Sequence, residues 1–82
     1  MKEKIMDALK QQSISESQFC WSQLEYKEAF KTDYNRWIEL GNEISNSFNE
    51  LLVENLISVK TEIFDCGVGN GLAVEKIYSL KI

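Results

Sequence analysis

The chain has 82 residues, of which 44% are hydrophobic, and it contains neither proline nor histidine. This length predicts one small domain, residues 1–82, and disfavours a multi-step enzyme. Without histidine the chain lacks the commonest general base and metal ligand, so we expect no enzymatic activity, no metal site and no cofactor. The net charge of −4 argues against direct binding of nucleic acid, which requires a basic surface.

The negative charge is concentrated in the middle of the chain. Residues 1–31 are neutral, whereas the segment from Asp33 to Asp65 carries seven acidic residues against two basic ones. Such a surface favours a basic protein partner over an anionic one.

Two further features bear on the location of the protein. No apolar run approaches the ~18 residues of a membrane span, and the charged start Met1-Lys2-Glu3-Lys4 is unlike a signal peptide. Cys20 and Cys66 lie far apart and match no zinc or redox spacing, so free thiols are expected. The sequence therefore predicts a cytoplasmic protein that does not associate with membranes.

In chain order, the first predicted element is a short helix over Lys2–Gln11. A second helix is expected to begin after Ser15, because Ser15 and Gln18 have the spacing of a capping box and Ile14 precedes them as a hydrophobic staple. Helical periodicity then predicts one broad buried face on this second helix, formed by Phe19, Cys20, Leu24, Tyr26, Lys27 and Phe30.

Trp21 falls on the opposite side of that second helix. Glu25 and Glu28 follow it at i+4 and i+7, which places an exposed tryptophan beside two carboxylates. Tryptophan is enriched among the residues that dominate interface energies, and acidic neighbours steer a basic partner. Trp21, Glu25 and Glu28 are therefore candidate partner-binding residues, although a partly buried structural aromatic is the ordinary alternative.

The most regular pattern runs from Tyr34 to about Leu56 and predicts a long helix capped by Thr32 or Asp33. Gly41 lies on its buried side, where another backbone is expected to approach closely. The opposite face carries a line of carboxylates about 22 Å long, which is either a solvated face or a mimic of a phosphate row. These four candidate partner-binding residues are Glu39, Glu43, Glu50 and Glu54.

The C-terminal part changes to β-forming residues. Ser58–Asp65 reads as a strand, residues 66–71 as a glycine-rich turn, and Leu72–Ile82 as a second strand of a hairpin. The predicted fold class is mainly α, of the α+β kind: antiparallel helices with a C-terminal β-hairpin. Because the tail also fits a helix that starts near Asn70, a four-helix bundle is the alternative.

One local motif resembles a known family. Asp65-Cys66-Gly67-Val68-Gly69-Asn70-Gly71 after Ile63-Phe64 is similar to the glycine-rich motif I of class I S-adenosylmethionine-dependent methyltransferases. The resemblance implies that Asp65 and the three glycines line a cofactor loop followed by a helix. An N-terminal fragment of such an enzyme is the alternative function, but without the later strands of that fold we expect no cofactor to bind.

A second resemblance concerns the size of the chain and two short segments, one near its start and one near its end. Its size, its acidity, the segment Ile14-Ser15-Glu16-Ser17-Gln18-Phe19 and the segment Asn70-Gly71-Leu72-Ala73-Val74-Glu75 resemble the colicin-D-type immunity proteins, small acidic inhibitors of a tRNA-cleaving toxin. This likeness implies a protein inhibitor and a helical tail, and it assigns no binding residue.

These observations together predict a non-catalytic acidic inhibitor. Its partner would be a basic nucleic-acid-handling protein such as a nuclease, and its role either immunity against a nuclease toxin or phage anti-defence of the anti-CRISPR kind. A self-associating structural protein, in the simplest case a homodimer, is a further alternative that the sequence leaves open.

Overall fold

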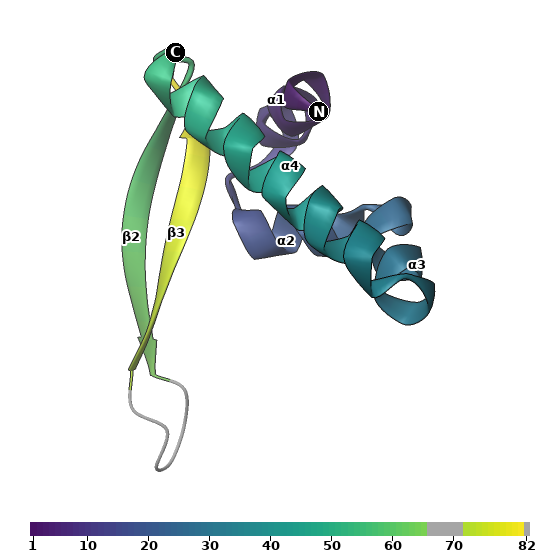
Figure 1. Ribbon diagram of the computed structural model, residues 1–82. Helices are drawn as coiled ribbons and strands as arrows, with labels where there is room; N and C mark the ends of the chain where they lie inside the picture. Colours follow the sequence, from purple (N-terminus) through teal and green to yellow (C-terminus); the bar gives the residue numbers. More distant parts are fainter. Residues whose placement is uncertain (66–71, 82) are drawn as a thin grey trace.

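A computed structural model describes residues 1–65 and 72–81. These ranges hold four helices and a three-stranded antiparallel sheet, so the mainly α prediction with a C-terminal hairpin is confirmed (Figure 1). No helix in the described ranges combines the length and the apolar character that crossing a bilayer requires. The elements are α1 (Lys2–Gln11), β1 (Ile14–Ser15), α2 (Glu16–Ser22), α3 (Leu24–Thr32), α4 (Tyr34–Val53), β2 (Ile57–Asp65) and β3 (Leu72–Leu80).

The starts of the helices follow the predicted capping residues. In α2 the Ser15 hydroxyl accepts a hydrogen bond from the Gln18 backbone N–H at 3.2 Å, and the Gln18 side chain accepts one from the Ser15 N–H at 3.0 Å. In α4 the Asp33 carboxylate accepts a hydrogen bond from the Arg36 N–H at 3.2 Å. Each cap satisfies backbone donors that have no partner within the helix.

The predicted second helix is two helices, and this expectation was wrong. The backbone turns at Gln23, whose φ of −90° and ψ of 120° end α2 and begin α3. The Ser22 hydroxyl donates to the Phe19 carbonyl at 2.6 Å, a local bond of the kind that competes with helix propagation. As a result Phe19 and Cys20 are buried as expected, whereas Leu24 and Phe30 are exposed.

The long helix α4 ends at Val53, before the predicted Leu56. Asn55 adopts a left-handed conformation with a φ of 63°. The Leu56 N–H then donates to the Leu51 carbonyl at 3.1 Å and the Asn55 N–H to the Leu52 carbonyl at 3.0 Å. This pair of bonds is a Schellman motif, with asparagine at the position that glycine usually occupies.

The C-terminal hairpin is confirmed and the four-helix bundle is excluded. Strands β2 and β3 pair antiparallel from Ile57 opposite Leu80 to Asp65 opposite Leu72. Strand β1 was not predicted. Its residues Ile14 and Ser15 pair with Tyr78 and Ile77 of β3 and complete the strand order β1-β3-β2. The far half of the hairpin extends beyond the helices (Figure 1).

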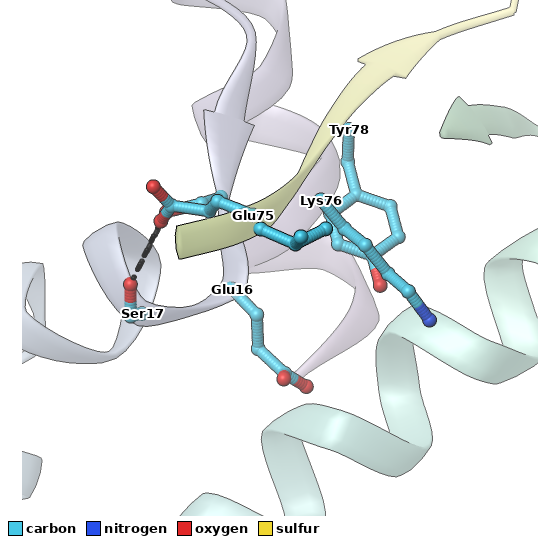
Figure 2. Close-up of a pocket in the computed structure, with 7 residues that line it drawn as sticks. Glu16, Ser17, Glu75, Lys76 and Tyr78 are labelled. Carbon is cyan, nitrogen blue, oxygen red and sulfur yellow. Dashed lines mark hydrogen bonds between the residues drawn. The ribbon is translucent and has the colours of Figure 1, made fainter. Parts of the chain in front are cut away.

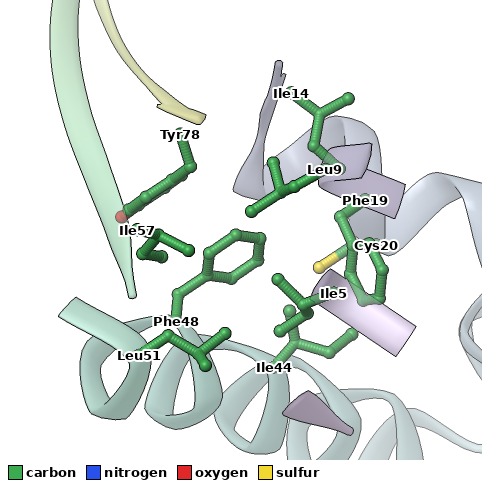
Figure 3. Packing of buried hydrophobic residues seen from close by; sticks show 10 residues of the cluster. All are labelled: Ile5, Leu9, Ile14, Phe19, Cys20, Ile44, Phe48, Leu51, Ile57 and Tyr78. Atoms are coloured by element: carbon green, nitrogen blue, oxygen red, sulfur yellow. The ribbon is translucent and has the colours of Figure 1, made fainter. Parts of the chain in front are cut away.

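The core lies where α1, α2 and α4 meet the near half of the sheet (Figure 3). The Phe48 ring is at its centre, with ring centroids 5.8 Å from Phe19 and 4.4 Å from Tyr78. Phe48 has no exposed surface. The remaining buried members of this cluster are Ile5, Leu9, Ile14, Cys20, Ile44, Leu51 and Ile57.

Candidate functional site

Five aromatic side chains form a second, outer group at the end of the molecule where α2, α3 and the start of α4 meet. Trp21 contacts Tyr26 and Phe30 with ring centroids 5.3 and 5.4 Å apart, and Trp37 contacts Tyr26, Phe30 and Tyr34 at 5.9, 5.2 and 5.5 Å. Most of these contacts are edge-to-face or tilted, which the ring quadrupoles favour. We call these five residues the aromatic cluster.

The aromatic cluster is open to solvent. The exposed fractions are 46% for Trp21, 53% for Phe30 and 67% for Tyr34, and the neighbouring side chains of Leu24 and Ile38 are exposed as well. Scattered apolar side chains on a surface are ordinary, whereas a contiguous exposed group of large ones is a candidate interaction site.

A small hollow of about 200 Å³ opens beside the aromatic cluster, lined by Tyr26, Trp37, Ile38, Gly41 and Asn42. The close backbone approach predicted at Gly41 is not found. A Cβ atom at that position would instead meet the Tyr26 side chain at 3.8 Å, an ordinary contact distance. Glycine at this position therefore leaves space open rather than making a backbone contact possible.

Two polar groups of the aromatic cluster are turned inward. The Trp37 indole nitrogen is buried and, within the described part of the chain, has no hydrogen-bond partner. Burial also raises the pKa of the Tyr26 hydroxyl above its usual value. The Tyr26 phenol is therefore protonated at neutral pH, and the indole nitrogen of Trp37 does not ionise in this range, so both groups are uncharged hydrogen-bond donors.

The helix break at Gln23 changes the surroundings predicted for Trp21. Because Trp21 belongs to α2 and Glu25 and Glu28 to α3, the i, i+4, i+7 relation does not apply, and the contacts of Trp21 are with Tyr26 and Phe30. The Glu25 carboxylate instead accepts a bond from the Arg36 guanidinium at 2.5 Å. All three predicted residues are exposed, as expected.

Arg36 connects the two groups of carboxylates that were predicted separately, the pair near Trp21 and the line along α4. Its guanidinium lies 2.5 Å from Glu25 on α3 and 3.5 Å from Glu39 on α4. Glu39, the first member of the acidic line, therefore lies at the same end of the molecule as the aromatic cluster.

The far end of the acidic line is partly neutralised, because one lysine lies between two carboxylates. The Lys2 ammonium lies 3.3 Å from Glu50 and 2.6 Å from Glu54, and its hydrogen bond to Glu54 raises the Lys2 pKa. In residues 1–65 and 72–81, Glu43 and Glu28 have no basic group within 4 Å. The four carboxylates predicted as one line thus differ in their ion pairs. Of the four, Glu39 and Glu43 are the two nearest the aromatic cluster.

A separate hollow of about 370 Å³ lies between the start of α2 and β3, and in it Ser17 donates to Glu75 at 3.1 Å (Figure 2). Tyr78 faces the same space together with Glu16 and Lys76. Burial first, and the Glu16 charge second, raise the Tyr78 pKa. The phenol therefore stays protonated near neutral pH, where it can donate a hydrogen bond but cannot act as a base.

Cys20 is a free thiol in the core, and Cys66 lies outside the described residues. Burial raises the pKa of Cys20 to about 11. A thiol with this pKa is protonated and unreactive near neutral pH, so Cys20 is a packing residue.

The structure describes parts of both segments that resemble known families. Asp65 ends β2, and the glycines at 67, 69 and 71 lie outside the described residues. Leu72–Leu80 forms a strand, whereas motif I of the methyltransferases is followed by a helix. Residues 14 and 15 form β1, residues 16–19 begin α2, and residues 72–75 belong to β3, so the helical tail implied by the likeness to immunity proteins is not found. Comparison with protein-family models, with curated proteins and with solved structures finds no match.

Trp21 was predicted from the sequence as an exposed residue. The other four members of the aromatic cluster were not predicted to join it in one surface group: Tyr26, Phe30, Tyr34 and Trp37. Tyr26 and Phe30 were placed in the core because one helix was continued through Gln23. A usable signal was present in the composition, since five of the nine aromatic residues fall between positions 21 and 37. None of these five belongs to the buried core, although Tyr26 packs against it, so the density of aromatic residues marks a group separate from the core.

Proposed function

We propose that this protein is a non-catalytic inhibitor that binds a basic, nucleic-acid-handling protein such as a nuclease. The observation that carries the proposal is the aromatic cluster, which is open to solvent and lies on helices that also carry exposed carboxylates. Immunity against a nuclease toxin and phage anti-defence both require this kind of binding, and the genes beside the one for this protein distinguish them.

The aromatic cluster supplies the affinity in this proposal. Tryptophan and tyrosine offer large rigid surfaces at low cost in conformational entropy, and they are enriched among interface hot spots. The rings already hold one another in edge-to-face contact, with Trp21 5.3 Å from Tyr26 and 5.4 Å from Phe30, so little ordering remains to be done on binding.

Exposed carboxylates on the same helices supply the preference for a basic partner. Glu28 lies on α3, and Glu39 and Glu43 lie on α4, the two helices that carry four of the five rings. An arginine or lysine of a nucleic-acid-binding groove is attracted both by these carboxylates and by the faces of the aromatic rings. Glu39 and Glu43 are one helical turn apart, about 6 Å along the axis, a spacing that suits successive cationic side chains that would otherwise hold phosphates.

The test uses the purified nucleases and nucleic-acid-binding proteins encoded beside the gene for this protein. Each is titrated with the inhibitor while cleavage or binding of a labelled oligonucleotide is measured. We expect complete inhibition at one equivalent, and loss of it when Trp21→Ala speeds dissociation by roughly 30-fold, equivalent to about 2 kcal/mol at a hot spot.

Val53→Ala is the matched control, because Val53 is an exposed apolar residue at the opposite end of α4. It should inhibit like the parent. The labelled oligonucleotide alone, mixed with the inhibitor, should show no binding. The proposal is rejected if no neighbouring protein is inhibited, or if Trp21→Ala and Val53→Ala inhibit equally well.

A further inference from the structure

Strand β2 is the outer strand of the sheet, and its outer edge carries no strand partner in the described ranges. The order β1-β3-β2 leaves Ile57–Asp65 paired on one side only. Figure 1 shows β2 on the side of β3 that faces away from α1, α2 and α3. Unpaired backbone N–H and C=O groups on such an edge form a template for another strand.

The side chains of β2 beyond the core are also exposed. Val59 is 44% exposed and Ile63 is 64% exposed, and Val74, which faces Ile63 across the hairpin, is 65% exposed. Residues 59, 61 and 63 alternate with Lys60 and Glu62, so these apolar side chains share one face of the sheet and the two charges share the other. This is the same face on which Ile57 enters the core.

We infer that β2 pairs antiparallel with β2 of a second copy, centred on Thr61, and so joins two three-stranded sheets into one. In this register Lys60 of each copy faces Glu62 of the other, and Val59 of each copy faces Ile63 of the other. Over residues 59–63 the strand is thus complementary to itself in charge on one face and in apolar character on the other, and this self-complementarity favours a second copy of the chain as the occupant of this edge.

Neighbouring registers lack this complementarity. Shifting the centre to residue 60 or to residue 62 places two lysines or two glutamates directly opposite each other, which is unfavourable. A register whose two-fold axis passes midway between two residues places apolar residues opposite charged ones. An edge lysine ordinarily disfavours strand pairing, and here it favours the register in which it meets Glu62.

The inferred dimer has a two-fold axis perpendicular to the sheet at Thr61. This operation keeps both helical layers on one face of the joined sheet and makes the contact isologous, so that it closes at two copies. Each exposed Ile63 then lies between Val74 of its own hairpin and Val59 of the second copy. The contact uses neither Trp21 nor the rest of the aromatic cluster, so it is independent of the proposed inhibitor surface.

The test is sedimentation equilibrium over a concentration series up to roughly 1 mM, where even a weak pairing is populated. The parent protein should dimerise. The single variants Lys60→Glu and Glu62→Lys each oppose like charges across the axis, and we expect their self-association to weaken roughly tenfold or more. An equimolar mixture of the two variants should form a heterodimer about as stable as the parent dimer.

The mixture separates pairing between chains from effects within one chain, because Lys60 and Glu62 also lie 3.7 Å apart in the same strand. The double variant Lys60→Glu/Glu62→Lys should dimerise like the parent. Lys4→Glu in α1 should do so too, because it makes the same change in net charge as Lys60→Glu but lies outside the strand. Thermal unfolding verifies that each variant folds.

Several results would overturn the inference: a parent protein that stays monomeric at roughly 1 mM, single variants that dimerise as well as the parent, or a mixture that gains no association. Loss of dimer in Trp21→Ala would likewise overturn it by assigning self-association to the aromatic cluster. Inhibition of a nuclease by a protein that is monomeric under all these conditions would leave the proposed function intact and reject the dimer alone.

Discussion

The molecule contains two groups of aromatic rings with similar contacts and opposite relations to solvent. Phe19, Phe48 and Tyr78 in the core are at most 5% exposed, whereas Trp21 in the aromatic cluster is 46% exposed. Ring centroids lie 4.4 to 5.8 Å apart in the core, and 5.3 Å separate Trp21 from Tyr26 in the cluster. Ring contact geometry alone therefore does not reveal whether an aromatic group stabilises the fold or is available to a partner.

The difference arises from what covers each group. The core rings are enclosed by α1, α2, α4 and the sheet (Figure 3). The rings of the cluster lie on α2, α3 and the start of α4, and their outer sides face solvent. The turn at Gln23 produces this arrangement because it directs α3 away from the axis of α2.

The largest expected contrast compares two phenylalanines. Phe48→Ala should lower the free energy of unfolding by about 3–5 kcal/mol, because it leaves a cavity among fully buried neighbours. Phe30→Ala deletes the same atoms from a side chain that is 53% exposed and should cost about 1 kcal/mol or less. Denaturant unfolding of both variants measures the difference, and equal losses would show that the cluster is part of the core.

A pH titration of stability tests how well the core excludes water. The pKa of Cys20 is raised from its usual value near 9 to about 11 by burial, so the folded protein holds this proton more tightly than the unfolded chain does. The contribution to stability is complete below pH 9 and lost as the pH rises toward 11, by up to about 2 kcal/mol.

Cys20→Ala isolates that contribution in the same pH range. The variant should lose less stability between pH 9 and 11 than the parent does. A smaller fall should remain, because the pKa values of Tyr26 and Tyr78 are also raised by burial. Identical pH profiles for variant and parent would mean that water reaches the thiol in the folded protein.

A smaller effect is expected at Gly41, beside the aromatic cluster. Gly41→Ala should raise the free energy of unfolding by up to about 1 kcal/mol, because alanine is the better helix former and its Cβ meets only Tyr26, at 3.8 Å. The same methyl group enters the hollow beside Trp37. If a partner fills that hollow, the more stable variant should inhibit less well, and unchanged inhibition would place the partner elsewhere on the cluster.

The smallest effect concerns two carboxylates of α4. Glu43→Lys should slow association with an inhibited nuclease several-fold and reduce its salt dependence, because steering acts over a Debye length of ~8 Å. Glu50 lies about 20 Å along the helix axis from Trp37 and already contacts Lys2. Glu50→Lys should therefore slow association less, and stopped-flow rates that fall equally would show that the whole acidic line is used.

Local signals in the sequence were sufficient for most of the fold. The caps at Ser15 and Asp33, the periodicity of α4 and the β-forming run before the glycines each depend on residues close together in the chain. The strand β1 was missed because its two residues become a strand only when β3, more than sixty residues later, lies beside them. No local pattern reports such a pairing.

The candidate site was predicted less completely than the fold. Trp21 and the six glutamates were predicted as partner-binding residues because each falls on the exposed face of a helix that was assumed to be continuous. The break at Gln23 has no proline or glycine to signal it, and the ion pairs of Arg36 with Glu25 and of Lys2 with Glu54 join residues from different elements. Which carboxylates remain free is a property of that tertiary arrangement.

The pairing of Ile14 with Tyr78 has a consequence for how fast the protein folds. Helical proteins of this size usually fold quickly, because most of their contacts join residues near in sequence. Here the core closes only when the segment after α1 meets the last strand, and drawing together a loop of more than sixty residues costs about 4 kcal/mol in chain entropy before the new contacts compensate. Refolding should therefore be slower than the helical content suggests, with the two ends of the chain joining late.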